Sequence, residues 1–231
     1  MVGLWGLLGC GGDDDEVVVR AEPLPAGVRA VEVSVPIEVT LREGPGVAAS
    51  AILTGPAEGV EAITLDIHGD TLTLTTSERG RWLSPKREAV TVTLVTAPLR
   101  QLDLYEGVAA RTTAPMTSER LTVGFRGKVG EADLEVATGW LRYFNNGATA
   151  GRLRLRGAVG ELVVDNIALA SVEAEACEAR VATVFNASRG DVAVRVTDSL
   201  RYEIEGAGDV VLYGAAAAVG EARGAGRLVR G

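Results

Sequence analysis

Acidic and basic side chains alternate with apolar ones along several segments in the C-terminal half of the chain, and these charged groups are the first candidates for chemistry. Carboxylates that face one another on a sheet can act as the acid and the base of polysaccharide cleavage. Aligning the repeated segments, however, opposes each carboxylate with an arginine, and unlike charges on neighbouring strands contribute about 0.2–1 kcal/mol per pair. Structural pairing therefore explains these residues, and a polysaccharide-acting enzyme is the alternative hypothesis. The two predicted columns are Glu135, Arg154 and Glu173, and Arg156, Glu175 and Arg195.

Other residue types that carry catalysis or bind metals occur singly. His68 is the only histidine and stands beside a turn, with no second metal ligand or nucleophile near it in sequence. Cys177 lies in an alternating apolar run, where the expected role is that of a small core residue. The sequence contains no phosphate-binding loop, no G-x-S-x-G motif and no Cys/His metal spacing. We therefore expect no catalytic residue, no metal site and no cofactor, and hence a non-enzymatic protein.

The strongest candidate for a contact surface is formed by Trp140, Arg142 and Phe144. Leu141 and Tyr143 take the inward register of a later repeat, so the three alternating residues should point outward on one strand. An outward Trp and Phe that flank an Arg make an exposed apolar patch, which is a common mark of a binding surface. The alternative is that a corner or the N-terminal strands cover these side chains.

The first ten residues, MVGLWGLLGC, form an apolar run that is too short to span a bilayer. The run resembles the end of a signal peptide, and its Leu-x-Gly-Cys ending resembles the lipobox of bacterial lipoproteins, in which the cysteine carries the lipid. The resemblance implies lipidation at Cys10 and attachment to a membrane of the bacterial envelope, with the outer membrane as the expected one. An ordinary cysteine in an apolar N-terminus is the alternative. Residues 11–27 are then expected to form an acidic tether.

The composition favours strands that are joined by tight corners. Hydrophobic residues make up 47% of the chain but aromatic residues only 4%, so Val, Leu, Ala and Ile carry the apolar content. The 29 glycines are spread along the chain, which suits many corners better than one linker. The net charge of −8 disfavours nucleic acid as a partner, because phosphate binding needs a basic face. We therefore expect an all-β fold.

Residues 28–98 show the two-residue alternation of half-buried strands and are expected to form an N-terminal antiparallel β portion. Gly69 and Asp70 separate two such runs and predict a hairpin turn.

From residue 99 to residue 231 the apolar positions recur about every 19 to 21 residues. A unit of two short strands at this period, without helix signals, predicts one coil of a β-solenoid. Stacked coils would join the apolar positions into one core, so residues 28–231 are expected to form one continuous domain. The predicted columns are Leu102, Leu121, Leu141, Leu162, Val181, Leu200 and Val219; Leu134, Leu153, Val172, Val192, Val210 and Leu228; and Val136, Leu155, Ala174, Val194 and Leu212.

The segment Leu200 to Gly214, LRYEIEGAGDVVLYG, is the clearest copy of the repeated unit. Its Gly-Ala-Gly-Asp corner would join two short strands, and a positive φ at the glycines would explain why glycine stands there. The predicted structural corners are Gly206, Gly208, Asp209, Gly224 and Gly226.

The N-terminal strands, the repeats and the closing segments LRYEIEGAGDVVLYG and ARGAGRLVRG together resemble the head GIN domain of the putative auto-transporter adhesin family. In that family Gly-x-Gly-Asp corners recur between short strands, so the resemblance implies a right-handed β-helix-like solenoid over residues 28–231. Three middle coils depart from the pattern, because they carry NNGATAG, DNIALAS and FNASRG at the corner. The family has no established catalytic residues. The resemblance implies a surface adhesion or binding module, whose partner would be an envelope protein or a polysaccharide.

The lipid anchor can be tested by substituting Cys10→Ser. Each buried acyl CH₂ contributes about 0.8 kcal/mol to membrane attachment, and several chains together hold a protein stably. The substituted chain should move from the membrane fraction to the soluble fraction when cells that make it are lysed and fractionated. Membrane association equal to that of the unsubstituted chain would refute lipidation at Cys10.

Overall fold

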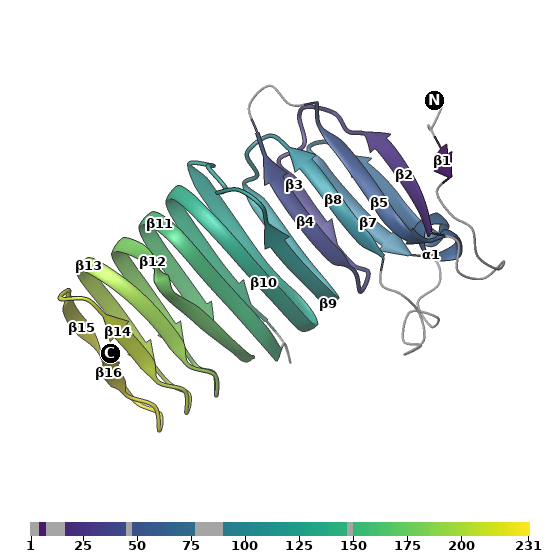
Figure 1. Ribbon diagram of the computed structural model, residues 1–231. Coiled ribbons are helices and arrows are strands. Elements are labelled where there is room, and N and C mark those ends of the chain that lie inside the picture. The colour runs from purple at the N-terminus through teal and green to yellow at the C-terminus, as the bar shows by residue number, and fades with distance from the viewer. Residues whose placement is uncertain (1–4, 8–16, 45–47, 77–89, 147–149) are drawn as a thin grey trace.

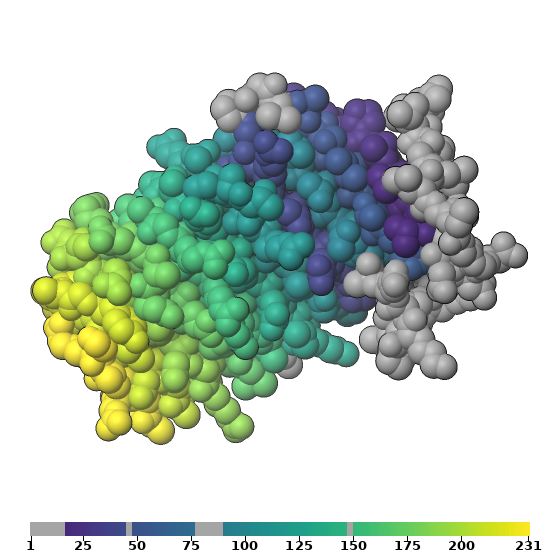
Figure 2. Space-filling model, viewed as in Figure 1, coloured from purple at the N-terminus to yellow at the C-terminus, as the bar shows by residue number. Residues whose placement is uncertain are grey.

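The structure is a computed structural model that describes residues 5–7, 17–44, 48–76, 90–146 and 150–231. Cys10 lies outside these residues. The chain is nearly all β, with 72% of residues in strands and 3% in helix, and it forms a β-solenoid of about 6 turns. Figure 1 shows the coils stacked in chain order, and Figure 2 shows the same order as a colour gradient along an elongated body. The predicted β-solenoid is therefore confirmed.

The N-terminal part of the chain combines hairpins with the first coil of the stack. Its elements are β1 (Trp5–Leu7), β2 (Val17–Pro23), β3 (Ala30–Val33), β4 (Glu38–Glu43), β5 (Ser50–Pro56), α1 (Ala57–Ala62), β6 (Ile63–His68), β7 (Thr71–Thr76) and β8 (Thr91–Thr96). β5 pairs antiparallel with β2 and β8, and β6 and β7 form the expected hairpin across Gly69, whose φ is +64°. β3 and β4 instead run parallel to β9, so they supply the first coil.

β2 lies in the segment that the sequence analysis assigned to the acidic tether, residues 11–27. It pairs along its whole length with β5, and Val18 is buried within it. Three consecutive valines, from Val17 to Val19, favour this extended conformation. Residues 17–23 therefore belong to the sheet and not to a tether.

The remaining strands form the coils. They are β9 (Gln101–Thr112), β10 (Arg120–Asn145), β11 (Ala150–Asn166), β12 (Leu169–Asn186), β13 (Val192–Ile204), β14 (Val210–Tyr213), β15 (Ala217–Ala222) and β16 (Leu228–Arg230). Each strand from β9 to β12 pairs in parallel with the next one, and β14, β15 and β16 continue the stack beyond β13. Their inward side chains make one continuous apolar core, as the repeat predicted.

One predicted apolar column is found almost complete. Leu153 lies opposite Val172, and the column continues through Val192, Val210 and Leu228. Other predicted positions are shifted because the coils differ in length: some ladders keep one offset throughout, as between β10 and β11, and in others the offset changes at a bulge, as in β12. In three places the observed partner differs from the predicted one: Leu134 lies opposite Leu155, Val136 opposite Gly157, and Leu102 opposite Val123. In two others a neighbouring residue takes the predicted position in the column: Ala182 stands there instead of Val181, and Ala218 instead of Val219.

The first predicted charge column is half right. Arg154 lies opposite Glu173, and its Nε donates to Glu173 Oε2 over 2.7 Å. On the other side Arg154 lies opposite Asp133, whereas Glu135 lies opposite Arg156, two residues from its predicted partner. Arg156 reaches diagonally back to Asp133 (2.9 Å). The column is therefore Asp133, Arg154 and Glu173, and it still alternates in sign.

The second predicted charge column does not form. Glu175 stands in a bulge of β12, where the register shifts between Arg154 and Arg156 on the neighbouring strand. Arg195 lies opposite Glu178, and its Nε donates to the backbone oxygen of Glu175 (2.7 Å). The inserted residues move Glu175 out of the ladder, which an alignment of apolar positions alone does not reveal.

Buried asparagines hold the corner at which each middle coil passes into the next. Asn145, Asn166 and Asn186 end β10, β11 and β12, and all three are buried. Asn145 Nδ2 donates to Asn166 Oδ1 (2.6 Å), and Asn166 Nδ2 donates to Asn186 Oδ1 (3.1 Å). Asn186 Nδ2 donates to Gly208 O (3.0 Å), so the ladder ends at the Gly-Ala-Gly-Asp corner. The three corners without that motif therefore use side-chain amides instead.

The corner glycines are required by contact with the preceding coil. Neither Gly206 nor Gly208 has a positive φ, which corrects the expectation from the sequence. A Cβ at Gly208 would lie 2.1 Å from Gly190 O, a distance that real Cβ atoms do not reach. The same contact recurs one coil later at Gly224 and Gly226. These positions are glycine because two backbones approach closely there.

Asp209 connects the same corner to the coils on both sides. Its backbone N donates to Asp191 Oδ1 (2.8 Å), and its Oδ1 accepts from the backbone N of Arg227 (2.9 Å). In the final coil Ala218 and Ala222 lie opposite the larger Leu200 and Ile204 of β13.

Substitution of Gly208→Ala should destabilise the solenoid. The new Cβ would collide with the Gly190 carbonyl, and overpacking of this kind costs about 1–3 kcal/mol. The control is Ala207→Val, since Ala207 is exposed in the same corner. Thermal unfolding should show a lower midpoint for Gly208→Ala than for Ala207→Val. Equal midpoints would mean that the coils do not approach closely at this corner.

Candidate binding surfaces

The structure places Trp140, Arg142 and Phe144 on the outer face of β10. They alternate with Leu141 and Tyr143, which are fully buried, so the outward orientation agrees with the alternation in the sequence. We call Trp140, Arg142 and Phe144 the aromatic row.

Arginines from the preceding part of the chain cover both rings of the aromatic row. The Arg120 guanidinium lies 4.1 Å from the centre of the Trp140 ring. The Arg126 guanidinium lies 4.7 Å from the centre of the Phe144 ring, with Arg142 at 5.6 Å. Each such contact contributes about 0.5–1 kcal/mol at an exposed site. Both rings are half-buried, and guanidinium groups lie beside them at the surface.

An ion pair between a buried carboxylate and a partly exposed guanidinium lies beneath Phe144. Asp103 is 1% exposed, its Oδ1 lies 2.9 Å from Arg126 Nε, and its Oδ2 accepts from Gln101 Nε2 (2.5 Å). The bond to Asp103 raises the pKa of the Arg126 guanidinium. A Cβ at Gly124 would lie 2.7 Å from Phe144 Cζ, so glycine is what lets the ring close over the acid. Sequence reasoning missed this support, because it depends on the register between β9 and β10.

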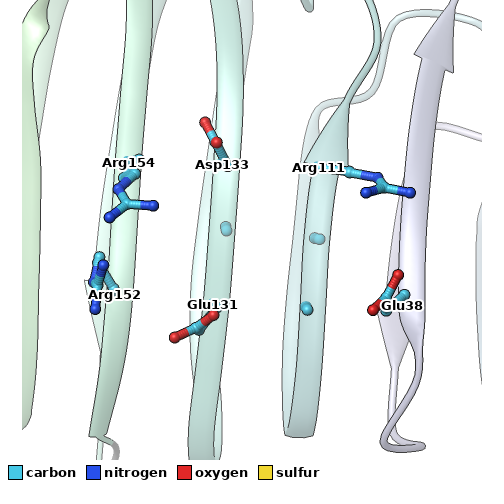
Figure 3. A pocket seen from close by; sticks show the side chains of 9 residues that line it. Glu38, Arg111, Glu131, Asp133, Arg152 and Arg154 are labelled. Atoms are coloured by element: carbon cyan, nitrogen blue, oxygen red, sulfur yellow. The ribbon is translucent and has the colours of Figure 1, made fainter. Parts of the chain in front are cut away.

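A hollow of about 200 Å³ lies on another part of the outer face, across β4, β9, β10 and β11. Figure 3 shows its charged walls, with Arg111 extending toward the strand that carries Glu38. Ala109 lies opposite Glu38 on one side and Glu131 on the other, so a short side chain separates two long acidic ones. The lining residues are Glu38, Ala109, Ala110, Arg111, Glu131, Ala132, Asp133, Arg152 and Arg154.

The charges of the hollow are only partly paired. Arg152 and Arg154 share Glu173, and Asp133 pairs with Arg156. Arg111 Nε donates to the Thr40 hydroxyl (3.2 Å). Within the described ranges no ion pair involves Arg111, Glu38 or Glu131. One guanidinium and two carboxylates therefore remain for a ligand. An alanine at an outward position of a charged segment is the only feature of the sequence that points to this hollow.

The buried glutamate of the sheet is engaged by backbone amides. Glu43 Oε1 accepts from Leu99 N (2.8 Å), and Oε2 accepts from Thr117 N (2.7 Å). Burial raises the pKa of Glu43, while these bonds act in the opposite direction. Because both oxygens hold loops to β4, Glu43 has a structural role.

The single histidine and the cysteine of the described sheet have no partner that would suit catalysis. His68 is exposed beside the hairpin turn. Cys177 is fully buried, as expected of a core residue, and burial raises the pKa of its thiol to about 11. In the described residues no group of three or more His, Cys, Asp or Glu side chains could hold a metal ion. No helix among them is long and apolar enough to cross a membrane.

Comparison with protein families gives a match over most of the chain. Residues 28–216 match the family described as "Putative auto-transporter adhesin, head GIN domain". No curated protein matches the chain.

Several solved structures have a similar fold. An adhesin described as putative from Bacteroides fragilis NCTC 9343 is 16% identical with a TM-score of 0.83, over 93% of this chain and 97% of that one. A second one, from Parabacteroides merdae ATCC 43184, is 14% identical with a TM-score of 0.64, over 93% and 96%. A "Putative lipid binding protein" from Parabacteroides distasonis ATCC 8503 is 13% identical with a TM-score of 0.61, over 93% and 96%. At these identities the similarity shows the fold alone.

Proposed function

Because the chain belongs to the head GIN domain family of auto-transporter adhesins, we propose that it is a non-enzymatic binding module anchored by lipid at the bacterial surface. The observation that carries the proposal is the aromatic row, in which two rings and a guanidinium stand on a segment that pairs with β11 and hydrogen-bonds at its two ends to Glu119 and Phe125 of the preceding coil. Aromatic and arginine side chains dominate the energy of many interfaces. A sheet that holds them in place reduces the entropy lost on binding.

The lipid anchor remains part of this proposal. β2 begins at residue 17, at the end of the solenoid opposite the C-terminal coil (Figure 1). An anchor at Cys10 would tether that end, and the coils from β10 onward would project away from the membrane. This arrangement would leave the aromatic row accessible to a partner.

Two other functions receive less support from the described residues. The similar protein with a lipid-binding description suggests an internal ligand, but the core of this solenoid is filled by packed side chains from β3 to β14. A polysaccharide-cleaving enzyme would need a carboxyl group kept protonated by apolar surroundings. Glu38 and Glu131, the unpaired acids of the hollow, are both exposed and stand among arginines.

The proposed function can be tested with the full chain that carries Cys10→Ser, labelled with a fluorophore. Envelopes isolated from cells that lack the chain should bind it saturably. Trp140→Ser combined with Phe144→Ser should weaken binding at least tenfold, which corresponds to about 1.4 kcal/mol, because the two rings would be the central contacts.

Tyr213→Ser provides the matched control, since Tyr213 is also a half-buried outward ring covered by an arginine, Arg195 at 5.7 Å. It should leave binding unchanged. Absence of saturable binding would contradict the adhesion role. An equal loss in both variants would show that the aromatic row is not the contact surface.

A further inference from the structure

We propose that the hollow over Ala109 is a subsite for one uncharged, polyhydroxylated sugar unit of a glycan. The inference goes beyond the proposed function, because the hollow lies on a different part of each coil from the aromatic row. The residues of β10 that line the hollow, Glu131 to Asp133, come before residues 139–140. At residues 139–140 the alternation changes phase, so that even-numbered side chains are buried before that point and odd-numbered ones after it. The aromatic row begins at that point.

The hollow exists because one side chain in a charged column is short. Glu38, Ala109, Glu131 and Arg152 lie opposite one another on β4, β9, β10 and β11. Strands are about 4.8 Å apart, so Glu38 and Glu131 stand roughly 10 Å from each other with only a methyl group between them. Ala110 and Ala132 border the space but are buried in the core, so the methyl group of Ala109 is the apolar element between the polar walls. Small-molecule sites commonly combine these two features.

The charges of the walls favour a ligand without net charge. Three arginines and three carboxylates line the hollow. An anionic group bound to Arg111 would meet the free carboxylate of Glu38, which Figure 3 shows beside it. A cationic group between Glu38 and Glu131 would meet the arginines. A hydroxyl both donates and accepts, so a sugar can donate to the two glutamates and accept from Arg111 at once.

The backbone around the hollow argues against a peptide as the ligand. Peptides that bind to sheets usually add as a strand at a free edge. β9 is paired with β4 and β10, and β10 is paired with β9 and β11, so their backbone groups already have partners. Recognition in the hollow must therefore use the charged side chains and the methyl group of Ala109, as a sugar ring would allow.

An array of immobilised glycans tests the inference. The array carries neutral glycans, glycans with uronic or sialic acids, and glycans with free amino sugars, and the probe is the labelled full chain with Cys10→Ser. The chain should bind at least one neutral glycan. Ala109→Phe, which fills the hollow without removing a charge, should weaken this binding at least tenfold. Arg111→Met and Glu131→Ala should each weaken it severalfold, and they test the site even where the larger side chain at residue 109 prevents folding.

Ala193→Phe is the matched control, because Ala193 is an outward alanine of the same kind on β13, opposite Glu173 and Val211. It should leave glycan binding unchanged, and so should the double substitution of Trp140 and Phe144, which separates this site from the proposed adhesion surface. Binding only to charged glycans, or to none, would overturn the inference. Full retention of binding in Ala109→Phe, Arg111→Met and Glu131→Ala would overturn it as well.

Discussion

Each coil of this solenoid must place its backbone amides directly opposite the carbonyls of the coil before it, and the rest of the structure depends on that register. At the corners the demand is strongest, because the chain changes direction while staying in contact with its neighbour. The middle coils meet it with buried asparagines: Asn145 donates to Asn166, Asn166 donates to Asn186, and Asn186 donates to the Gly208 carbonyl. The later coils meet it by removing the Cβ, as at Gly208. The hydrogen bond from Asn186 to Gly208 joins the two solutions.

The sequence pattern predicted the class of fold because a stack of coils repeats its buried positions. Alternation identified Leu153, Val172 and Val192 as one column, and it identified Leu141 and Tyr143 as inward residues. It failed where a coil is longer than the assumed repeat, as between β10 and β11, and where a bulge changes the register, as in β12. Charges did not correct the error, because long side chains reach diagonally to a partner, as in the pair of Arg156 with Asp133. The spacing of the three asparagines was the signal that would have fixed the register of the middle coils.

The candidate sites were predictable to different degrees for the same reason. Trp140 and Phe144 are recognisable from their residue type and from the alternation around them, so their outward orientation could be predicted from one strand alone. Their covering arginines, Arg120 and Arg126, come from an earlier segment, and only the correct register brings them together. The hollow depends on four strands at once. Ala109 defines the hollow only because it lies opposite acidic residues of β4 and β10, and these strands are far from it in sequence.

The most direct test of the account is a double-mutant cycle between Asn166 and Asn186. The free energy of unfolding is measured for Asn166→Ala, for Asn186→Ala and for the chain with both substitutions. Each single change leaves a buried amide group without its partner, whereas the double change removes both groups. The loss of unfolding free energy in the double variant should therefore be smaller than the sum of the two single losses by about 1–3 kcal/mol. Costs that add to within about 0.3 kcal/mol would show that the two amides do not interact, and would contradict the buried ladder as the element that holds the coils in register.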